Sequence, residues 1–274
     1  MDASLLAAQL EELGEPAFRK TQIWEWMARG AASWDGMSNL PKQLRRELEQ
    51  RVPFSTLTHV VDAKSKDGTV KSLFQTAEGR PIEAVLMRYA DGRRSICVSS
   101  QSGCPLTCTF CATGTMKFGR NLTSHEIVDQ ALHLRRIEPI DHCVFMGMGE
   151  PTMNIDNVLA ACELLPDVGI TNRRTAISTV GWVPGIERLT DENTAIRLAL
   201  SLHARKVFVE YLMLKGVNDS PSQARELARI LDPQRYKVNL IPYNPTGSYD
   251  GSPAEVIEDF RAELDRRGHT ATIR

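Results

Sequence analysis

Hydrophobic positions in the first fifty residues recur at the spacing of an α-helix. Residues 17–29 hold several apolar side chains within a few turns, and Gly30 ends the run. Pro41 suits the first turn of a second helix, over the charged stretch 42–51. We therefore expect residues 1–52 to form a small helical domain.

From about residue 55 the pattern changes to short runs rich in β-branched residues. The pairs Asp67-Gly68 and Asp91-Gly92 separate such runs, and Asp-Gly is a strong hairpin signal. The pattern predicts an antiparallel β-meander extension over residues 53–93. The three strands of the meander are expected at 57–63, 70–76 and 81–89, and the strand that follows the meander is expected at 94–99.

From residue 94 to 274, strand-like and helix-like patterns alternate. Repeated βα units favour a parallel sheet covered by helices, either doubly wound or closed into a full or partial barrel. In both arrangements ligands bind at the C-terminal ends of the strands. Strands are expected at 143–148, 175–180, 196–201, 210–214, 237–241 and 270–273, and helices at 124–136, 155–165, 184–189, 221–231 and 253–267.

Composition indicates an ordinary globular protein, with 42% hydrophobic and 24% charged residues. No apolar run reaches membrane-spanning length, and the N-terminus lacks the layout of a signal peptide, so we expect a cytoplasmic protein without a membrane partner. The net charge of −1 permits a nucleic-acid partner without requiring one. A basic stretch could contact RNA, although such charges more often lie on solvated faces; it contains Arg88, Arg93, Arg94, Lys117 and Arg120.

Three cysteines form a C-x3-C-x2-C cluster: Cys104, Cys108 and Cys111, with Phe110 just before the third. A short loop with this spacing can wrap three thiolates around one [4Fe–4S] cubane and leave one iron open. Zinc is the main alternative, but structural zinc usually takes four ligands, and no second cysteine or histidine pair lies nearby. The spacing with its aromatic residue resembles the radical S-adenosylmethionine (SAM) superfamily.

Polar residues follow the predicted strands at their C-terminal ends. Each one alone is more often a cap or a turn residue. At successive strand ends of one sheet they would form a polar ring over the cluster, and we expect them to bind SAM. They are Gly149, Glu150, Ser178, Ser201, Leu202, His203 and Asn244.

Several segments together resemble the RlmN/Cfr family of adenine-C2 RNA methyltransferases: 14–19, 97–104, 112–114, 119–123, 147–151, 201–204 and 241–245. The resemblance implies an α/β fold, a radical SAM partial (β/α)6 barrel over 94–274 with the N-terminal helical domain and the β-meander extension. It also implies methylation of 23S rRNA, and of tRNA in many members. It further implies a monomeric protein that receives electrons from a donor such as flavodoxin or ferredoxin.

The chemistry of that family assigns roles to two more residues. C2 of adenine is not nucleophilic, so the family first moves a methyl group from SAM to a cysteine near its C-terminus, and a radical made from a second SAM activates that methyl group. Glu83 matches the base that removes the C2 proton, and Cys97 matches the cysteine that resolves the RNA adduct by forming a disulfide. Without the resemblance, Glu83 could equally be a solvent-exposed edge residue, and Cys97 a small core residue like Cys143 and Cys162.

One feature departs from the family pattern. No cysteine follows Cys162, so nothing matches the methyl-carrying residue. We expect a C-terminally truncated sequence, because Glu83 and Cys97 have little use without that partner. The alternatives are an RNA-binding protein that keeps its cluster but has lost catalysis, and a radical SAM enzyme of another reaction type.

Overall fold

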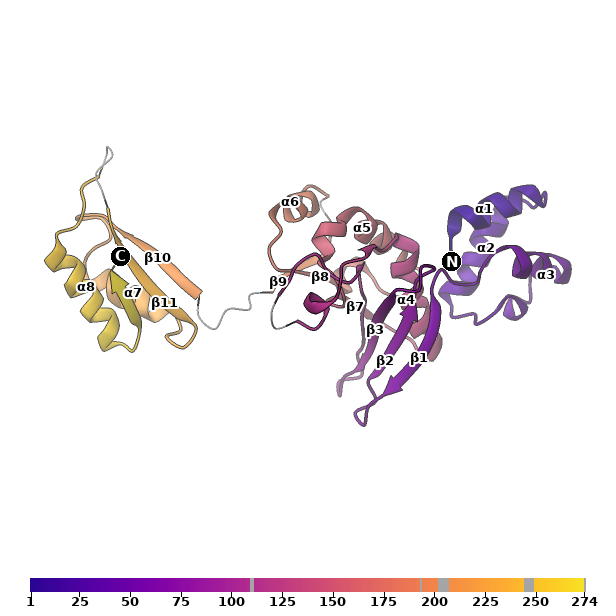
Figure 1. Cartoon of the computed structure of the whole chain (residues 1–274), viewed down its shortest axis with the longest axis horizontal. Helices are drawn as coiled ribbons and strands as arrows, with labels where there is room; N and C mark the ends of the chain where they lie inside the picture. Colours follow the sequence, from indigo (N-terminus) through magenta and orange to yellow (C-terminus); the bar gives the residue numbers. More distant parts are fainter. Residues whose placement is uncertain (109–110, 193, 202–206, 244–248, 274) are drawn as a thin grey trace. The chain divides into compact units, whose positions relative to one another are not determined.

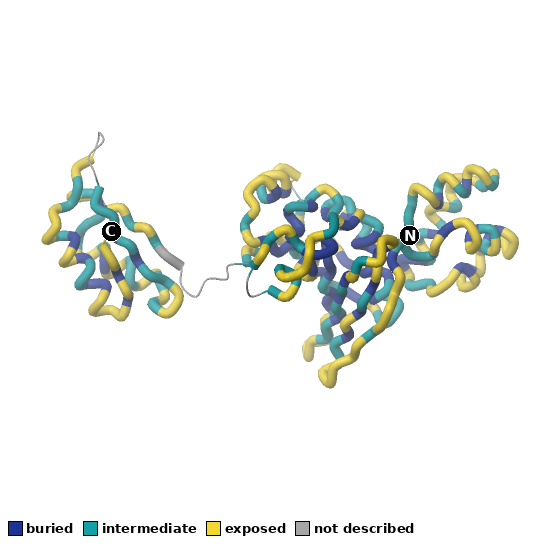
Figure 2. The backbone as a smooth tube through the Cα atoms, in the orientation of Figure 1, coloured by how far each residue is buried: buried dark blue, intermediate teal, exposed yellow. Residues whose placement is uncertain are grey.

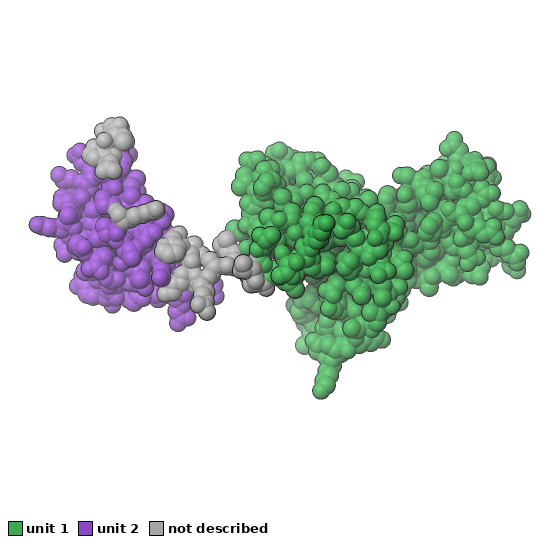
Figure 3. All heavy atoms as spheres, viewed as in Figure 1, with its two compact units in different colours: residues 1–201 green, residues 202–274 purple. Residues whose placement is uncertain are grey.

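The computed structural model describes residues 1–108, 111–192, 194–201, 207–243 and 249–273. These residues form two compact units, Met1–Ser201 and Leu202–Arg274, coloured separately in Figure 3. The boundaries expected at 52/53 and 93/94 both fall inside the first unit.

The N-terminal region is helical, with α1 at Ala3–Glu12, α2 at Phe18–Ala28 and α3 at Lys42–Arg51. Asp2 caps α1 by accepting hydrogen bonds from the backbone N–H groups of Ser4 and Leu5. The apolar side of this region joins the main core of the first unit through Ile23, Met27, Leu44 and Leu48.

A seven-stranded sheet dominates the first unit (Figure 1), in the order β1-β2-β3-β4-β7-β8-β9. Strands β1 to β4 pair antiparallel as the predicted meander, and β4, β7, β8 and β9 pair parallel. The meander and the start of the radical SAM core therefore share one sheet. The strands are β1 Thr58–Lys64, β2 Val70–Gln75, β3 Pro81–Arg88, β4 Arg94–Cys97, β7 His142–Phe145, β8 Thr175–Thr179 and β9 Arg197–Leu200.

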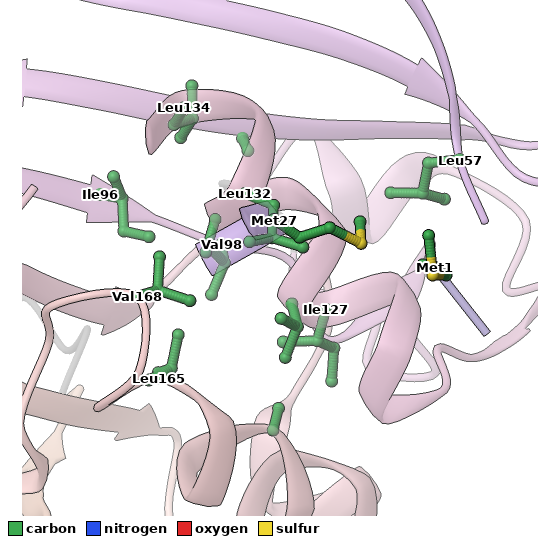
Figure 4. Close-up of a cluster of buried hydrophobic side chains, with 14 of the residues drawn as sticks. Met1, Met27, Leu57, Ile96, Val98, Ile127, Leu132, Leu134, Leu165 and Val168 are labelled. Carbon is green, nitrogen blue, oxygen red and sulfur yellow. The ribbon is translucent and has the colours of Figure 1, made fainter. Parts of the chain in front are cut away.

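The two faces of this sheet differ in burial, as the alternating colours of the strands in Figure 2 show. On β3, Ile82, Ala84 and Leu86 are buried, whereas Glu83 and Val85 are only partly buried. The buried face packs on α4 (Ser124–Ile137) and α5 (Ile155–Leu164), and part of this core is drawn in Figure 4, including Ile96, Val98, Ile127 and Leu132.

Short elements complete the first unit. Strands β5 (Gln101–Ser102) and β6 (Arg120–Asn121) form a two-stranded ribbon that encloses the cysteine loop. The helix α6 spans Val183–Asp191, and single helical turns η1 to η4 lie at Trp34–Gly36, Thr113–Thr115, Pro151–Asn154 and Asn172–Arg174.

The second unit is a three-stranded parallel sheet, β10-β11-β12, with α7 (Pro221–Ile230) and α8 (Ala254–Arg266). Its strands are β10 Val207–Met213, β11 Tyr236–Pro242 and β12 Thr270–Ile273. Its own core contains Met213, Val238, Leu240, Phe260 and Leu264.

The predicted α/β fold with βα alternation is confirmed, and among the described residues its strands belong to two sheets, one in each unit. Among the described residues, no helix is long and apolar enough to cross a membrane.

Candidate active site

Glu83 and Cys97 lie on the same face of the large sheet. Cys97 pairs with Val85 across the β3–β4 ladder, and Glu83 is two residues from Val85, so side-chain alternation directs both to one side. That side is opposite the helix-covered core, because the intervening residues Ile82, Ala84 and Ile96 are buried.

Strand polarity also brings Glu83 to the functional edge of the sheet. Because β3 runs antiparallel to β4, the first residues of β3 lie beside the C-terminal end of β4. The hydroxyl of Ser99 donates to the backbone carbonyl of Glu83 at 2.6 Å, which ties these two segments together. The predicted base therefore lies at the edge where the parallel strands end, the usual ligand-binding edge of such sheets.

The environment of Glu83 is partly open and contains a positive charge. Its side chain is 43% exposed, and its Oε1 atom accepts a hydrogen bond from Nζ of Lys71 on β2 at 2.9 Å. The Glu83 side chain therefore lies on the open face of the sheet, where the ammonium group of Lys71 holds it. Lys71 could not be identified from the sequence, because only the β2–β3 register brings it near Glu83.

Cys97 is a partly buried free thiol at the last position of β4. Burial raises the pKa of this thiol, and a hydrogen bond from the backbone of Met146 opposes that shift. At neutral pH the group is a protonated thiol, so a base must take its proton before it can attack another sulfur.

The three clustered cysteines lie in a loop closed by β5 and β6. The backbone N–H of Gly119 donates to the carbonyl of Ser102 at 2.7 Å, and Gln101 and Asn121 pair across the ribbon. Gly114 lies so close to Cys108 that a Cβ atom there would be 2.7 Å from its carbonyl oxygen. A compact, closed loop therefore presents the thiols.

The three thiols supply the donor set of an iron–sulfur cubane. Cys104, Cys108 and Cys111 are partly buried free thiols within eight residues of the chain. Three thiolates can hold three irons of a cubane and leave the fourth iron open, whereas structural zinc usually takes four ligands. Burial raises the pKa of the Cys104 thiol, and the nearby charges of Cys108 and Glu150 raise it further.

Glu150 is buried after β7 and holds two strand ends together. Its Oε1 accepts hydrogen bonds from the backbone N–H and hydroxyl of Thr152 at 3.1 and 2.6 Å, and its Oε2 accepts one from the backbone N–H of Val180 at 3.0 Å. Its own backbone N–H donates to Gln101 Oε1 at 2.8 Å. Most of the acceptor capacity of this predicted SAM ligand is thus used within the protein. Gln101, which connects the cluster loop to Glu150, was missed because nothing in its local sequence marks it.

The glycines before Glu150 are required by close packing. A Cβ atom on Gly147 would lie 2.8 Å from the Ser99 hydroxyl, and one on Gly149 would lie 2.6 Å from Gln101 Cβ. Gly149 also has φ +100°, a conformation that favours glycine. These residues let the segments 98–101 and 147–150 lie side by side.

Two of the predicted polar strand ends contact each other. The hydroxyl oxygens of Ser178 on β8 and Ser201 after β9 are 2.5 Å apart. Register places Ser178 on the sheet face that carries Cys97, since Cys97 pairs with Val144 and Val144 with Ala176. Leu202, His203 and Asn244 lie outside the described residues.

Comparison with known proteins identifies the family. The profile of the radical SAM superfamily matches residues 98–260, and the profile of the ribosomal RNA large subunit methyltransferase N-terminal domain matches residues 1–53. The chain is 39% identical to a probable dual-specificity RNA methyltransferase RlmN of Thermus thermophilus, over 96% of this chain and 86% of that protein. This chain belongs to the RlmN family of radical SAM RNA methyltransferases.

Other relatives support the same assignment. A dual-specificity RNA methyltransferase RlmN of Marinobacter nauticus is 37% identical over 100% of this chain and 87% of that protein. The crystal structure of a radical SAM methyltransferase from Sphaerobacter thermophilus matches with a TM-score of 0.69 and 37% identity, over 100% of this chain and 93% of that chain. The alignment with the Thermus thermophilus protein spans 308 positions, more than the 274 residues here, so that relative has residues with no counterpart in this chain.

The remaining cysteines of this RlmN-family chain are structural. Cys143 and Cys162 are buried in the main core; burial raises the pKa of Cys143 far above its usual value and that of Cys162 to about 12. All six cysteines are free thiols, so the disulfide expected from the family mechanism does not form among the described residues. Neither buried thiol can act as an accessible nucleophile.

Proposed function

We propose that this chain supplies the radical-generating, base and resolving parts of an adenine-C2 RNA methyltransferase that forms 2-methyladenosine in 23S rRNA, and also in tRNA. The observation that supports this most is the placement of Glu83 and Cys97 on one open sheet face, at the edge where the cysteine loop begins. Two residues from separate strands share a face only when the register suits, and a reaction that uses both needs that arrangement.

Cys104, Cys108 and Cys111 would hold a [4Fe–4S] cluster, which when bound supplies the electron for reductive cleavage of SAM. Gly149, Glu150, Ser178 and Ser201 would form the SAM-binding edge of the first unit. Glu150 acts there largely as a positioning residue, because its carboxylate already joins Thr152 and Val180.

Glu83 would accept the proton from C2 of the adenine. It can do so because it is open to the substrate side, at the end of the strand beside Cys97. Lys71 positions the carboxylate by holding its Oε1 atom, which leaves the other oxygen to receive the proton.

Cys97 would release the product. Its thiolate attacks the sulfur of the methyl-carrying cysteine and forms an S–S bond. The carbon–sulfur bond of the adduct breaks, and the electron pair left on carbon takes up a proton to give the methyl group. The methyl-carrying thiol is none of the six cysteines of this sequence, since three serve the cluster, Cys97 is the resolving thiol and two are buried.

The basic stretch predicted to approach RNA is partly occupied by ion pairs. Arg120 makes two 2.7 Å hydrogen bonds to the carboxylate of Glu126, and Arg94 pairs with Glu138 at 3.0 Å. Arg93 pairs with Asp91 at 2.7 Å and stacks over the exposed ring of Tyr89. Lys117 is exposed and has no ion pair among the described residues. We infer that Lys117 contributes more to RNA binding than Arg93, Arg94 or Arg120. Electrons would come from a donor such as flavodoxin or ferredoxin in the cytoplasm.

The test separates radical generation from methyl transfer. The 274-residue chain, reconstituted anaerobically and reduced, should convert SAM slowly to 5′-deoxyadenosine and methionine without methylating 23S rRNA fragments. A fusion to a family-type C-terminal segment with its cysteine should form 2-methyladenosine, detected by mass spectrometry of digested RNA. In that fusion, Cys97→Ala should accumulate a covalent RNA adduct. Methylated adenine from the 274-residue chain itself would contradict the proposal.

A further inference from the structure

Three side chains that commonly bind metal ions converge between the edge strand β1 and helix α4. They are His59 and Asp62 on β1 and His133 on α4, and a ligand atom of each lies within 4.8 Å of the other two. None of them belongs to the cysteine loop or to the strand ends described above. The group is therefore separate in sequence from the proposed active site.

A β-bulge brings His59 and Asp62 together. Residues three apart on a regular strand point to opposite faces. Here His59 pairs with Phe74 and Asp62 with Ser72, and the register shifts between His59 and Val61, so one extra residue is inserted. Because Ser72 and Phe74 are two residues apart, both His59 and Asp62 face the side on which α4 packs. Bulges often re-aim side chains at functional sites.

The distances suit a small divalent ion. Oδ1 of Asp62 lies 2.9 Å from Nε2 of His59 and 3.2 Å from Nε2 of His133. A tetrahedral zinc ion with bonds of 2.0–2.1 Å holds neighbouring nitrogen and oxygen ligands about 3.3 Å apart. The rings of His59 and His133 stack with their centroids 4.3 Å apart. One ring must therefore turn out of this stack before two imidazoles and a carboxylate can bind such an ion.

Surrounding residues orient the three ligands. The hydroxyl of Ser72 donates to Oδ1 of Asp62 at 2.6 Å. The ring of Phe74 meets His133 edge-on at 5.0 Å and His59 at 5.8 Å, which restricts both imidazole planes. Outer contacts of this kind fix ligand orientation in protein metal sites.

Without an ion, one oxygen atom would have to satisfy three donors. Ser72, His59 and His133 all approach Oδ1 of Asp62, although a carboxylate oxygen offers about two lone-pair positions. With an ion bound, each ring nitrogen would direct a lone pair to the metal instead of a proton to Asp62. Ion binding would reduce the number of donors at Oδ1 of Asp62, and the ion would be held by the same nitrogen and oxygen atoms.

We propose that His59, Asp62 and His133 bind a zinc ion that fastens strand β1 to helix α4. Strand β1 needs such a link, because six of its seven residues are exposed and it lies at the edge of the sheet. The side chains of His59 and Asp62 are 39% and 26% exposed, so an ion can enter and water can complete its coordination. Two imidazoles and one carboxylate, with no thiolate, suit a zinc ion and do not suit an iron–sulfur cluster.

The test uses the full chain with its iron–sulfur cluster reconstituted, so that the cluster cysteines are occupied. Zinc is titrated in the presence of a chelating competitor, bound zinc is counted by mass spectrometry of the elements, and coordination is read by X-ray absorption at the zinc edge. We expect one zinc per chain, nitrogen and oxygen neighbours at about 2.0–2.1 Å and no sulfur near 2.3 Å. Zinc should also raise the melting temperature.

Matched variants decide whether these residues hold the ion. His59→Gln, Asp62→Asn and His133→Gln should each abolish stoichiometric zinc binding and the rise in melting temperature, and Ser72→Ala should weaken binding about 10- to 100-fold. His142→Gln is the control, since His142 is a partly buried histidine on β7 that contacts Asp141 and should leave zinc binding unchanged. His59→Gln changes an exposed side chain, so loss of folding does not confuse its result. Zinc retained equally by the three ligand variants, sulfur at 2.3 Å, or no bound zinc in the unaltered chain would each overturn the proposal.

Discussion

Glu83 and Cys97 lie on one face of the sheet, related through Val85, which pairs directly with Cys97 and is two residues from Glu83. Diagonal neighbours of this kind in an antiparallel pair are separated by about 7–8 Å or slightly less. Such a gap allows the carboxylate and the thiol to act on the same adduct without contacting each other.

The first prediction concerns Glu83 as the base. In the fusion that restores a methyl-carrying cysteine, Glu83→Gln should lower 2-methyladenosine formation by about 10²- to 10⁴-fold, because an amide cannot accept the C2 proton. Formation of 5′-deoxyadenosine should stay the same, since the cluster loop is unaffected. Both products are measured by mass spectrometry. Glu78→Gln, at an exposed glutamate paired with Arg120, is the control and should leave both unchanged. Full methylation by Glu83→Gln would place the base elsewhere.

The second prediction concerns the cluster. Anaerobic reconstitution should give about four irons per chain, and Cys104→Ala, Cys108→Ala or Cys111→Ala should each remove it, because three thiolates are the minimum for this open-iron site. Cys143→Ala and Cys162→Ala should keep full iron content, since both thiols lie in the apolar core. Iron analysis with electron paramagnetic resonance checks this. Equal iron in a triple alanine variant would refute the assignment.

The third prediction concerns Glu150 as a structural carboxylate. Glu150→Ala should lower the free energy of unfolding by about 1–3 kcal/mol, because the buried backbone N–H of Thr152 and the partly buried one of Val180 lose their acceptor. Urea unfolding of the variant measures the change. Glu163→Ala, at an exposed position of α5, should stay within about 0.5 kcal/mol. SAM affinity should fall as well, and an unchanged affinity would show that this strand end is not part of the SAM site.

The fourth prediction concerns RNA binding. Lys117→Ala should lower the log–log salt dependence of RNA affinity by about one unit. Arg93→Ala, Arg94→Ala and Arg120→Ala should change it less, since Asp91, Glu138 and Glu126 already neutralise these side chains. Affinity measured over a range of salt concentrations tests this. If all four variants behave alike, those ion pairs open when RNA binds.

The fifth prediction concerns alkaline stability. Burial raises the pKa of Cys162 to about 12 in the folded protein, while an unfolded thiol titrates near 9. Stability from this group is complete below pH 9 and falls by about 1.4 kcal/mol per pH unit between 9 and 12, because only the unfolded state releases the proton. Cys162→Ala should make urea unfolding less dependent on pH over the accessible part of that range. An unchanged pH dependence would contradict the assignment of this thiol to the core.

The sequence by itself determined the features that depend on local spacing. The assignment of Cys104, Cys108 and Cys111 to a cluster stays a prediction, and the sequence alone could make it because one short loop carries all three. The helices at 17–29 and 42–51 and the hairpins at Asp67-Gly68 and Asp91-Gly92 were predicted correctly for the same reason, since side-chain periodicity and turn residues act over a few positions.

Only the tertiary structure decided which distant residues meet. Lys71 reaches Glu83 through strand register, and Gln101 reaches Glu150 through close packing at Gly149. Register and packing depend on how whole strands align, and a shift of one residue would turn every side chain to the other face. The bulge that joins His59 to Asp62 shows the same point, since sequence spacing alone assigns these two residues to opposite faces.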